Sequence, residues 1–208
     1  MRTYRPVSLN PLLFLIALNI IIFIVTLARP GDIYSLLGLT VANFPHQPWT
    51  IITNLFVHDY RGIWHILFNM ISLFFLGRFL LQLVGEERFL VVYFLGGIVG
   101  NLFFILLILF APHIPLISHL VSPQDKYIPG VGASGAIFAI GGALAVMAPG
   151  LKVFIIPIPV PIPLWIAMII FLLLSFVFSG IAWQAHLGGL LLGLGAGYYF
   201  KKRGYFYF

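Results

Sequence analysis

The chain has 208 residues, of which 62% are hydrophobic and only 8% are charged. Because a soluble domain carries roughly 25% charged residues, this composition excludes an ordinary water-soluble enzyme or binding domain and indicates a membrane protein. The formal net charge of +6 does not require a nucleic acid partner, since the basic residues lie mostly between the apolar stretches, as membrane proteins place them. The chain has no cysteine, which excludes disulfides and thiolate chemistry.

Six apolar stretches predict six transmembrane helices. In chain order they cover residues 11–28, 65–83, 89–111, 134–148, 164–179 and 183–200. Four are long enough to span a membrane, whereas those at 134–148 and 164–179 are shorter. The first lacks a small-residue cleavage site and is long for a signal peptide, so we expect a retained helix. Residues 1–208 are therefore expected to form one domain, an all-α membrane protein built as a compact bundle of six helices, without the internal repeat of many transporters.

The basic residues predict how the bundle is oriented. If the N-terminus is cytoplasmic, six spans return the C-terminus to the same side. Eight basic residues then lie inside: Arg2, Arg5, Arg78, Arg88, Lys152, Lys201, Lys202 and Arg203. Three lie outside: Arg29, Arg61 and Lys126. This bias follows the positive-inside rule and predicts that both termini are cytoplasmic.

The connections differ in length and composition. The first, at residues 29–64, is long and contains an apolar patch at residues 51–57, so we expect it to lie partly in the membrane interface and to be functional. Residues 85–88 predict a short turn, and residues 112–131 predict a loop rich in turn formers. An extended connector, neither helix nor central strand, is predicted at 149–163 from four alternating prolines: Pro157, Pro159, Pro161 and Pro163. The connection at 179–182 is very short.

A serine between small residues opens the stretch at 134–148, in the motif Gly132-Ala133-Ser134-Gly135. A helix of about 15 residues rises only about 22 Å, too little to cross a hydrocarbon core of about 30 Å. One end must therefore start below the membrane surface, and Ser134 is at that end. A single serine in a membrane helix usually bonds to its own helix or packs among small neighbours, so this motif alone does not establish a site.

Topology brings further polar residues to the same side of the membrane. With the N-terminus inside, the second, fourth and sixth helices all start outside. His65 and Asn69 lie at the start of the second, Ser134 at the start of the fourth, and His186 three residues into the sixth. Each has a plain structural alternative, because Asn69 can bond across helices and a membrane histidine can serve packing. Their joint occurrence in one half of the membrane favours a site for nucleophilic catalysis.

The residue types suggest a role for each member of this group. Serine is a weak nucleophile and needs a base, and a buried neutral imidazole such as that of His186 can accept its proton. A carboxylate is the usual third member, but none of the five acids lies within a span: Asp32, Asp59, Glu86, Glu87 and Asp125. The sequence therefore predicts a Ser–His dyad rather than a triad. No His–carboxylate spacing suggests a metal, and no cofactor is expected.

A tetrahedral intermediate also needs hydrogen-bond donors for its oxyanion. His65 and Asn69 are four residues apart and share one helix face. The backbone N–H groups of Ala133 and Ser134 are at a helix N-terminus, where they are unpaired and the helix dipole favours negative charge. The backbone can approach closely at two flanking glycines, Gly132 and Gly135. Phe138 lies one turn beyond Ser134 and is expected to pack against the His186 ring.

Three segments resemble the motifs of the rhomboid family of intramembrane serine proteases: residues 65–69, residues 132–135, and Ala185-His186-Leu187-Gly188-Gly189 with Gly193. The resemblance implies a nucleophile at Ser134, a base at His186 and an oxyanion site that includes His65 and Asn69. It also implies a prokaryotic plasma membrane location and a water-filled site that opens to the extracytoplasmic side, gated by the fifth helix. Its partners would be the lipid bilayer and single-span membrane proteins, which it would cut at small residues in or near a helix-destabilised stretch.

Three positions depart from the usual family pattern. Thr50 follows Trp49 where many relatives have arginine, Leu81 stands where many have glutamate, and Phe138 stands where tyrosine is common. The anchoring of the first loop must therefore differ. The alternative function is that of an inactive rhomboid-like protein that binds membrane clients. Such proteins typically lack the serine or the histidine, and both are present here, which favours the protease.

Overall fold

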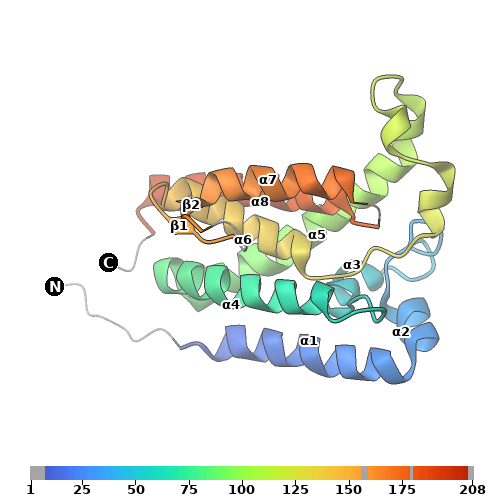
Figure 1. Cartoon of the computed structure of the whole chain (residues 1–208), viewed down its shortest axis with the longest axis horizontal. Coiled ribbons are helices and arrows are strands. Elements are labelled where there is room, and N and C mark those ends of the chain that lie inside the picture. The colour runs from blue at the N-terminus through green and yellow to red at the C-terminus, as the bar shows by residue number, and fades with distance from the viewer. Residues whose placement is uncertain (1–7, 156–158, 179, 206–208) are drawn as a thin grey trace.

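The computed structural model describes residues 8–155, 159–178 and 180–205, and these form a mostly α-helical bundle (Figure 1). The expectations for Arg2, Arg5, Pro157 and Ser179 lie outside the described residues. The long helices begin and end within three residues of the stretches expected from the sequence. They are α1 (Asn10–Ala28), α4 (Trp64–Val84), α5 (Glu86–Phe110), α6 (Ser134–Met147), α7 (Leu164–Val177) and α8 (Trp183–Arg203).

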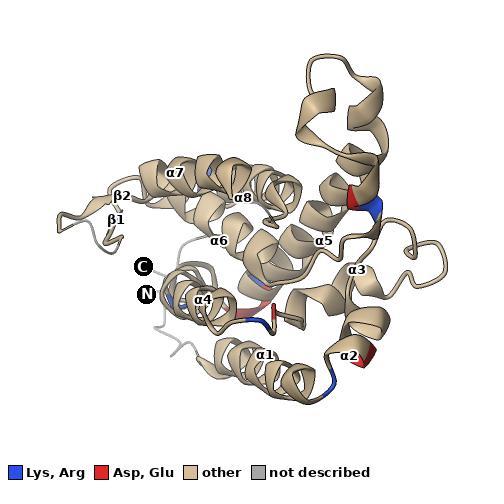
Figure 2. Ribbon diagram, turned by 45° about the vertical axis from the view of Figure 1, so that its right-hand side comes forward, with Lys and Arg blue, Asp and Glu red and all other residues tan. Residues whose placement is uncertain are grey.

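The apolar helices identify an integral membrane protein. Three helical segments are long and apolar enough to cross a membrane: Asn10–Ala28, Trp64–Val84 and Glu86–His113. Helices α6 and α7 are apolar but have only 14 residues each. Lys, Arg, Asp and Glu residues lie mostly at helix ends and in loops (Figure 2). Arg78 lies in the last two turns of α4. Helix α8 has 21 residues, but Gln184, His186 and several glycines reduce its hydropathy.

Helix α6 is the centre of the bundle, between α4 on one side and α7 and α8 on the other (Figure 1). All residues from Gly135 to Leu144 are buried. A helix that is apolar all round and protein-covered on every face belongs in a core. Because neighbouring helices cover Gly135–Leu144, this short apolar helix is stabilised by packing within the protein.

Small residues bring α6 and α8 into backbone contact. The contact repeats every fourth residue and pairs Gly189 with Gly135, Gly193 with Ala139, and Gly197 with Ala143. A Cβ at Gly197 would lie 2.6 Å from the backbone oxygen of Ala143, and the other two pairs are closer still. Residues four apart share one helix face, and small residues on such a face permit close helix packing in membranes. This contact fixes the axial register of α8 against α6.

The first loop contains α2 (Pro30–Leu37), α3 (Thr50–Thr53) and a 3-10 turn, η1 (Asn54–Phe56). The apolar patch expected in the interface divides into two parts. Leu55 and its two following residues are buried, and Leu55 fills the space beside Gly97 of α5, 2.6 Å from where a Cβ would lie. Ile52 and Trp49 remain exposed. The second half of the patch is therefore core rather than interface.

The remaining connections are short elements at the two ends of the bundle. The prediction of a turn over residues 85–88 was wrong. Helix α5 already begins at Glu86, and Gly85 alone, with φ of 84°, joins it to α4. Acidic residues suit the first turn of a helix because of its dipole. Two segments of the proline-rich connector, β1 (Lys152–Val153) and β2 (Ile162–Pro163), pair as antiparallel strands. The loop after α5 contains η2 (Ala111–His113), η3 (Ser118–Leu120) and η4 (Pro123–Tyr127).

Candidate active site

Ser134 and His186 are in direct contact. Ser134 is the first residue of α6, and His186 lies in the first turn of α8. Both helices start at the same end of the bundle (Figure 1). The Nε2 atom of His186 is 2.8 Å from the Oγ atom of Ser134, a normal hydrogen-bond distance. The parallel course of α6 and α8 and their glycine register thus join two residues that are 52 positions apart in sequence.

The ring of His186 is oriented by an aromatic neighbour. The Phe138 ring stacks on it with centroids 4.3 Å apart and an angle of 14° between the planes, which is the packing expected from the sequence. The other ring nitrogen, Nδ1, is buried and has no hydrogen-bond partner within the described ranges. Aromatic packing therefore orients this imidazole, a role that a carboxylate has in a catalytic triad.

His65 lies across a small gap from Ser134. Its Nδ1 atom accepts a hydrogen bond from the backbone N–H of Asp59, with an N–N distance of 3.3 Å. Its Nε2 atom lies 2.8 Å from the position that a Cβ on Gly132 would occupy, and Oγ of Ser134 lies 3.9 Å from that position. Gly132 has φ of 119°, so both the backbone conformation and the space require glycine. His65 and Ser134 thus border one space beside Gly132.

The side-chain amide of Asn69 already makes a hydrogen bond within α4. Its Nδ2 atom donates to the backbone oxygen of His65 at 2.8 Å, within its own helix. Its Oδ1 atom is buried and has no hydrogen-bond partner among the described residues. The bond across helices that was considered for Asn69 is therefore not what holds it. The amide group of Asn69 has two protons, so one remains available as a donor.

The helix N-terminus supplies further donors next to Ser134. Ala133 is the N-cap residue of α6, and the first backbone N–H groups of a helix have no acceptor within it. Gly135 lies against the start of α8, where a Cβ would be 3.3 Å from the backbone oxygen of Ala185. Glycine at Gly135, and at Gly189 and Gly193 further along the contact, permits this approach.

An asparagine pair that the sequence did not single out anchors the loop before Ser134. Asn54 of η1 and Asn101 of α5 are buried and exchange two amide hydrogen bonds, of 3.0 and 2.8 Å. The Nδ2 atom of Asn101 also donates to the backbone oxygen of Ile51 at 2.7 Å. Asn54 accepts from the backbone N–H of Gly132 through its own backbone oxygen at 3.0 Å. Burial of an asparagine within an apolar helix costs free energy unless its amide is hydrogen-bonded. The position of Asn101 within such a helix was therefore the sequence signal that could have indicated a buried partner.

Two of the three departures from the family pattern, at Thr50 and Leu81, have local explanations. The hydroxyl of Thr50 donates to the backbone oxygen of Gln47 at 2.6 Å, so it caps its own turn. Leu81 is completely buried in the core, where a charged residue would need a partner. The first loop is tied down instead by the asparagine pair and by Trp49, whose Nε1 donates to the backbone oxygen of Leu36 at 2.8 Å.

A water-sized cavity lies beside Ser134. Five of the residues that line it are Asn54, Asn101, Gly132, Ser134 and Ala185. Its volume accommodates about one water molecule, and its wall provides the polar partners that an ordered water requires. No group of three or more histidines and acids that could hold a metal ion occurs within the described part of the chain.

Comparison with known proteins identifies a family and several relatives. The family model of the Rhomboid domain matches residues 45–203. The putative rhomboid protease YdcA of Bacillus subtilis (strain 168) is 34% identical over 157 residues, which are 75% of this chain and 68% of that protein. Rhomboid protease GluP of the same organism is 33% identical over 146 residues, 70% of this chain but 24% of GluP.

Other relatives are longer, and one of them is described as inactive. Rhomboid protein 1 of Saccharomyces cerevisiae mitochondria is 29% identical over 158 residues, 74% of this chain and 42% of that protein. The inactive RHOMBOID-like protein 8 of Arabidopsis thaliana is 31% identical over 99 residues, 48% of this chain and 23% of that protein. The chain thus covers less than half the length of these two relatives and of GluP. The match of the Rhomboid domain to residues 45–203, which include Ser134 and His186, shows that the chain belongs to the rhomboid family.

Proposed function

We propose that the protein is an intramembrane serine endopeptidase, with Ser134 as nucleophile and His186 as general base. The observation that carries this proposal is the hydrogen bond of 2.8 Å between Oγ of Ser134 and Nε2 of His186. A serine hydroxyl becomes an effective nucleophile only when a base within hydrogen-bond reach accepts its proton. The rhomboid proteases among the relatives support the same chemistry.

The reaction proceeds in two halves. In the first, Nε2 of His186 takes the hydroxyl proton while Oγ of Ser134 attacks the substrate carbonyl carbon. The protonated imidazole then gives this proton to the leaving amine, and an acyl-enzyme ester remains. In the second half, His186 deprotonates a water molecule that attacks the ester, and the proton returns to Ser134 as the acid product leaves. The cavity beside Ser134 has room for this water.

The oxyanion would be held by donors from two helices. The backbone N–H groups at the start of α6 face the developing charge, and the helix dipole stabilises it. Nε2 of His65 adds a side-chain donor from α4, beside Gly132. The remaining amide proton of Asn69 adds another. Loss of one such donor typically lowers kcat by about 10²–10³, and partial compensation by the others predicts a smaller loss for Asn69→Ala.

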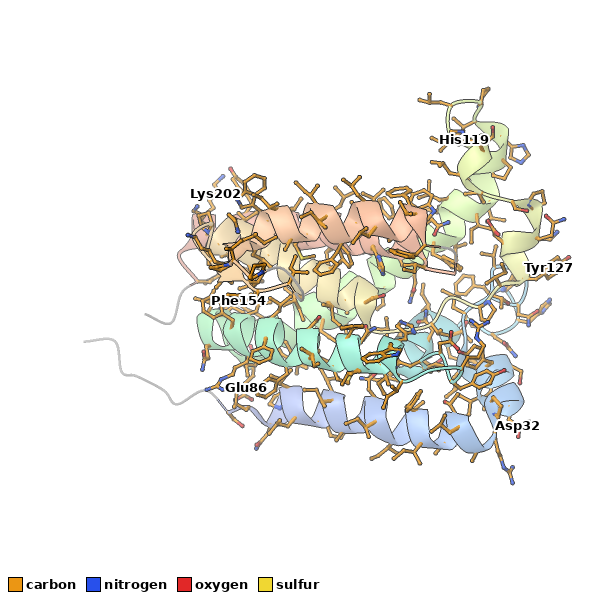
Figure 3. The ribbon with its side chains drawn as sticks, in the orientation of Figure 1. Asp32, Glu86, His119, Tyr127, Phe154 and Lys202 are labelled. Carbon is orange, nitrogen blue, oxygen red and sulfur yellow. The ribbon has the colours of Figure 1, made fainter. Side chains whose placement is uncertain are left out.

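The substrates would be single-span membrane proteins, which reach the site from within the bilayer. The outer ends of α4, α6 and α8 carry the site. Lys202 and Glu86 lie at the opposite end of the bundle from Asp32 and Tyr127 (Figure 3). The basic residues at the first end, including Lys201 and Arg203 of α8, favour a cytoplasmic location for that end and for both termini. The site would then open to the extracytoplasmic side.

The experiment that tests the proposal compares purified wild type with Ser134→Ala and His186→Ala on a generic single-span substrate. Both variants are expected to lose cleavage while keeping the thermal stability of the wild type. The second candidate is an inactive rhomboid-like protein that binds membrane clients, which one relative's description as inactive makes relevant. No cleavage of any single-span substrate by wild type would favour that candidate, whereas cleavage by Ser134→Ala at the wild-type rate would show that Ser134 is not the nucleophile.

A further inference from the structure

Residues 58–62, here called the Asp59 turn, precede α4 and contact His65. Within this turn, the Arg61 guanidinium donates to the Asp59 carboxylate through two nitrogens. Nε of Arg61 is 2.9 Å from Oδ1 of Asp59, and Nη2 is 2.8 Å from Oδ2. The backbone N–H of Arg61 donates to the same Oδ1 at 3.0 Å. A two-point guanidinium–carboxylate contact fixes geometry better than a single ion pair, so the turn has a defined shape.

A hydrogen bond from α2 also fixes the Asp59 turn. Tyr34 of α2 donates its hydroxyl hydrogen to the backbone oxygen of His58 at 3.3 Å. The side chain of His58 is completely buried, and its ring meets the His65 ring edge-on, with centroids 5.1 Å apart. His65 is therefore enclosed by the Asp59 turn on one side, and its Nε2 points to the space beside Gly132 on the other.

One hydrogen bond links this turn to the chemistry of the His65 ring. The backbone N–H of Asp59 donates to Nδ1 of His65. A ring nitrogen that accepts a hydrogen bond carries no proton, so the single proton of a neutral imidazole must be on the other nitrogen, Nε2. The nitrogen beside Gly132 and Ser134 is thereby made a hydrogen-bond donor.

We propose that the Asp59 turn is a positioning element that holds His65 as an Nε2–H donor, with Asp59 and Arg61 as its positioning residues. The inference rests on the proposed function, since the donor serves an oxyanion only if Ser134 acts as a nucleophile. A backbone N–H cannot change its role from donor to acceptor, so it excludes the tautomer with the proton on Nδ1. Without the fixed turn, His65 would exchange tautomers and lose part of its donor function.

The first test separates kcat from KM in a cleavage assay. Asp59→Ala and Arg61→Gln are expected to lower kcat by about 3- to 10-fold, part of the full loss of an oxyanion donor, and to leave KM unchanged. Asp32→Ala is the matched control, because Asp32 belongs to an exposed pair with Arg29 (3.8 Å) far from His65 in the sequence. A loss in the control equal to that of Asp59→Ala would overturn the proposal.

The second test asks whether the turn acts through His65. A glutamine in its place has an amide NH₂ that needs no tautomer control. Asp59→Ala is therefore expected to have no further effect on kcat when combined with His65→Gln. If Asp59→Ala costs the same factor in both backgrounds, the turn acts on the fold alone and the proposal is wrong.

A spectroscopic readout keeps this inference separate from the proposed function. The ¹⁵N resonances of His65 in detergent-solubilised protein report which ring nitrogen carries the proton. Wild type should show the proton on Nε2, and Asp59→Ala should show a mixture of tautomers. A proton on Nδ1 in wild type would overturn the positioning role even in an active protease. Absence of cleavage in every variant would contradict the proposed function, and the ¹⁵N spectrum would still decide the positioning.

Discussion

Gly193 of α8 lies directly against the backbone carbonyl of Ala139 in α6, one turn beyond the contact of Gly189 with Gly135. A side chain at Gly193 would have to displace backbone, which is far stiffer than a neighbouring side chain. The contact therefore sets the depth of His186 relative to Ser134. A shift of α8 of even about 1 Å would lengthen their hydrogen bond beyond normal geometry.

We predict that Gly193→Ala destabilises the protein by about 1–3 kcal/mol, the usual cost of overpacking, and lowers cleavage more than tenfold by misaligning the dyad. Thermal unfolding in detergent and a cleavage assay measure the two effects. Gly195→Ala is the matched control on the same helix, because a Cβ there has nothing within 4 Å. Equal behaviour of the two variants would show that the glycine contact does not set the register.

The asparagine pair predicts a different pattern of loss. Asn101→Ala leaves the buried Oδ1 atom of Asn54 without its hydrogen-bond donor, which costs about 1–3 kcal/mol. The Nδ2 atom of Asn54 keeps its bond to the backbone oxygen of Gly130 at 3.3 Å. Because Asn54 also holds the backbone of Gly132, kcat should fall as well. Thermal unfolding and kcat of Asn101→Ala should be compared with those of Asn10→Ala, whose side chain is exposed. Unchanged kcat in a destabilised Asn101→Ala protein would show that the pair supports the fold but not the site.

The helices and the end of the bundle that carries the candidate site were predictable from sequence for a physical reason. Helix length and apolar composition fix where spans begin, and alternation of direction then puts the starts of α4, α6 and α8 at one end. His65, Ser134 and His186 meet because each lies near such a start.

Features that depend on contacts between distant loops were not predictable. Asn54 and Asn101 are 47 positions apart, and one lies in a loop whose path no periodicity describes. The burial of Leu55 depends on the absence of a side chain at Gly97, which a short apolar run does not reveal. The backbone N–H of Asp59 makes the hydrogen bond to His65, so no pattern of side chains in the sequence predicts this bond.

The buried His58 predicts a dependence of stability on pH. Burial lowers the pKa of His58 to about 3, whereas an unfolded histidine titrates near 6.5. The unfolded chain therefore binds a proton that the folded protein does not bind. The contribution of neutral His58 to the free energy of unfolding should be fully present above about pH 6.5. It should fall by up to about 1.4 kcal/mol per pH unit between pH 6.5 and 3.

We predict that His58→Phe removes this contribution and flattens the pH dependence of the free energy of unfolding. A phenyl ring keeps the edge-on contact with His65 and does not titrate. Neither ring nitrogen of His58 makes a hydrogen bond of normal geometry to a described residue, and the backbone of Phe56 offers only a weak one, so little bonding is lost. His46→Gln, an exposed histidine of the same loop, is the control. Parallel curves for wild type and His58→Phe would contradict the prediction.

Lateral access to the site is expected to depend on one aromatic contact at the C-terminal end of α7. The Phe176 ring stacks on Trp183 at the start of α8, with centroids 4.4 Å apart, so this contact is to α8 and not to α4. The hydroxyl of Ser175, a buried polar side chain of α7, donates to Leu172 of its own helix at 2.6 Å. In the N-terminal half of the helix, Met168 fills the space beside Gly141. Packing rather than hydrogen bonding thus holds the described C-terminal end of α7.

Phe176→Ala should therefore raise cleavage of transmembrane substrates about 2- to 10-fold, since an aromatic stack contributes about 0.5–1.5 kcal/mol, and should leave hydrolysis of a small soluble ester unchanged. Phe178→Ala, at an exposed neighbouring ring, is the control. Because the chain has no cysteine, cysteines at positions 176 and 183 can be joined by a short bifunctional crosslinker without side reactions. The crosslinked protein should hydrolyse the ester but not the transmembrane substrate, because the substrate must part α7 from α8 to reach Ser134. Undiminished cleavage of the transmembrane substrate after complete crosslinking would mean that it enters by another path.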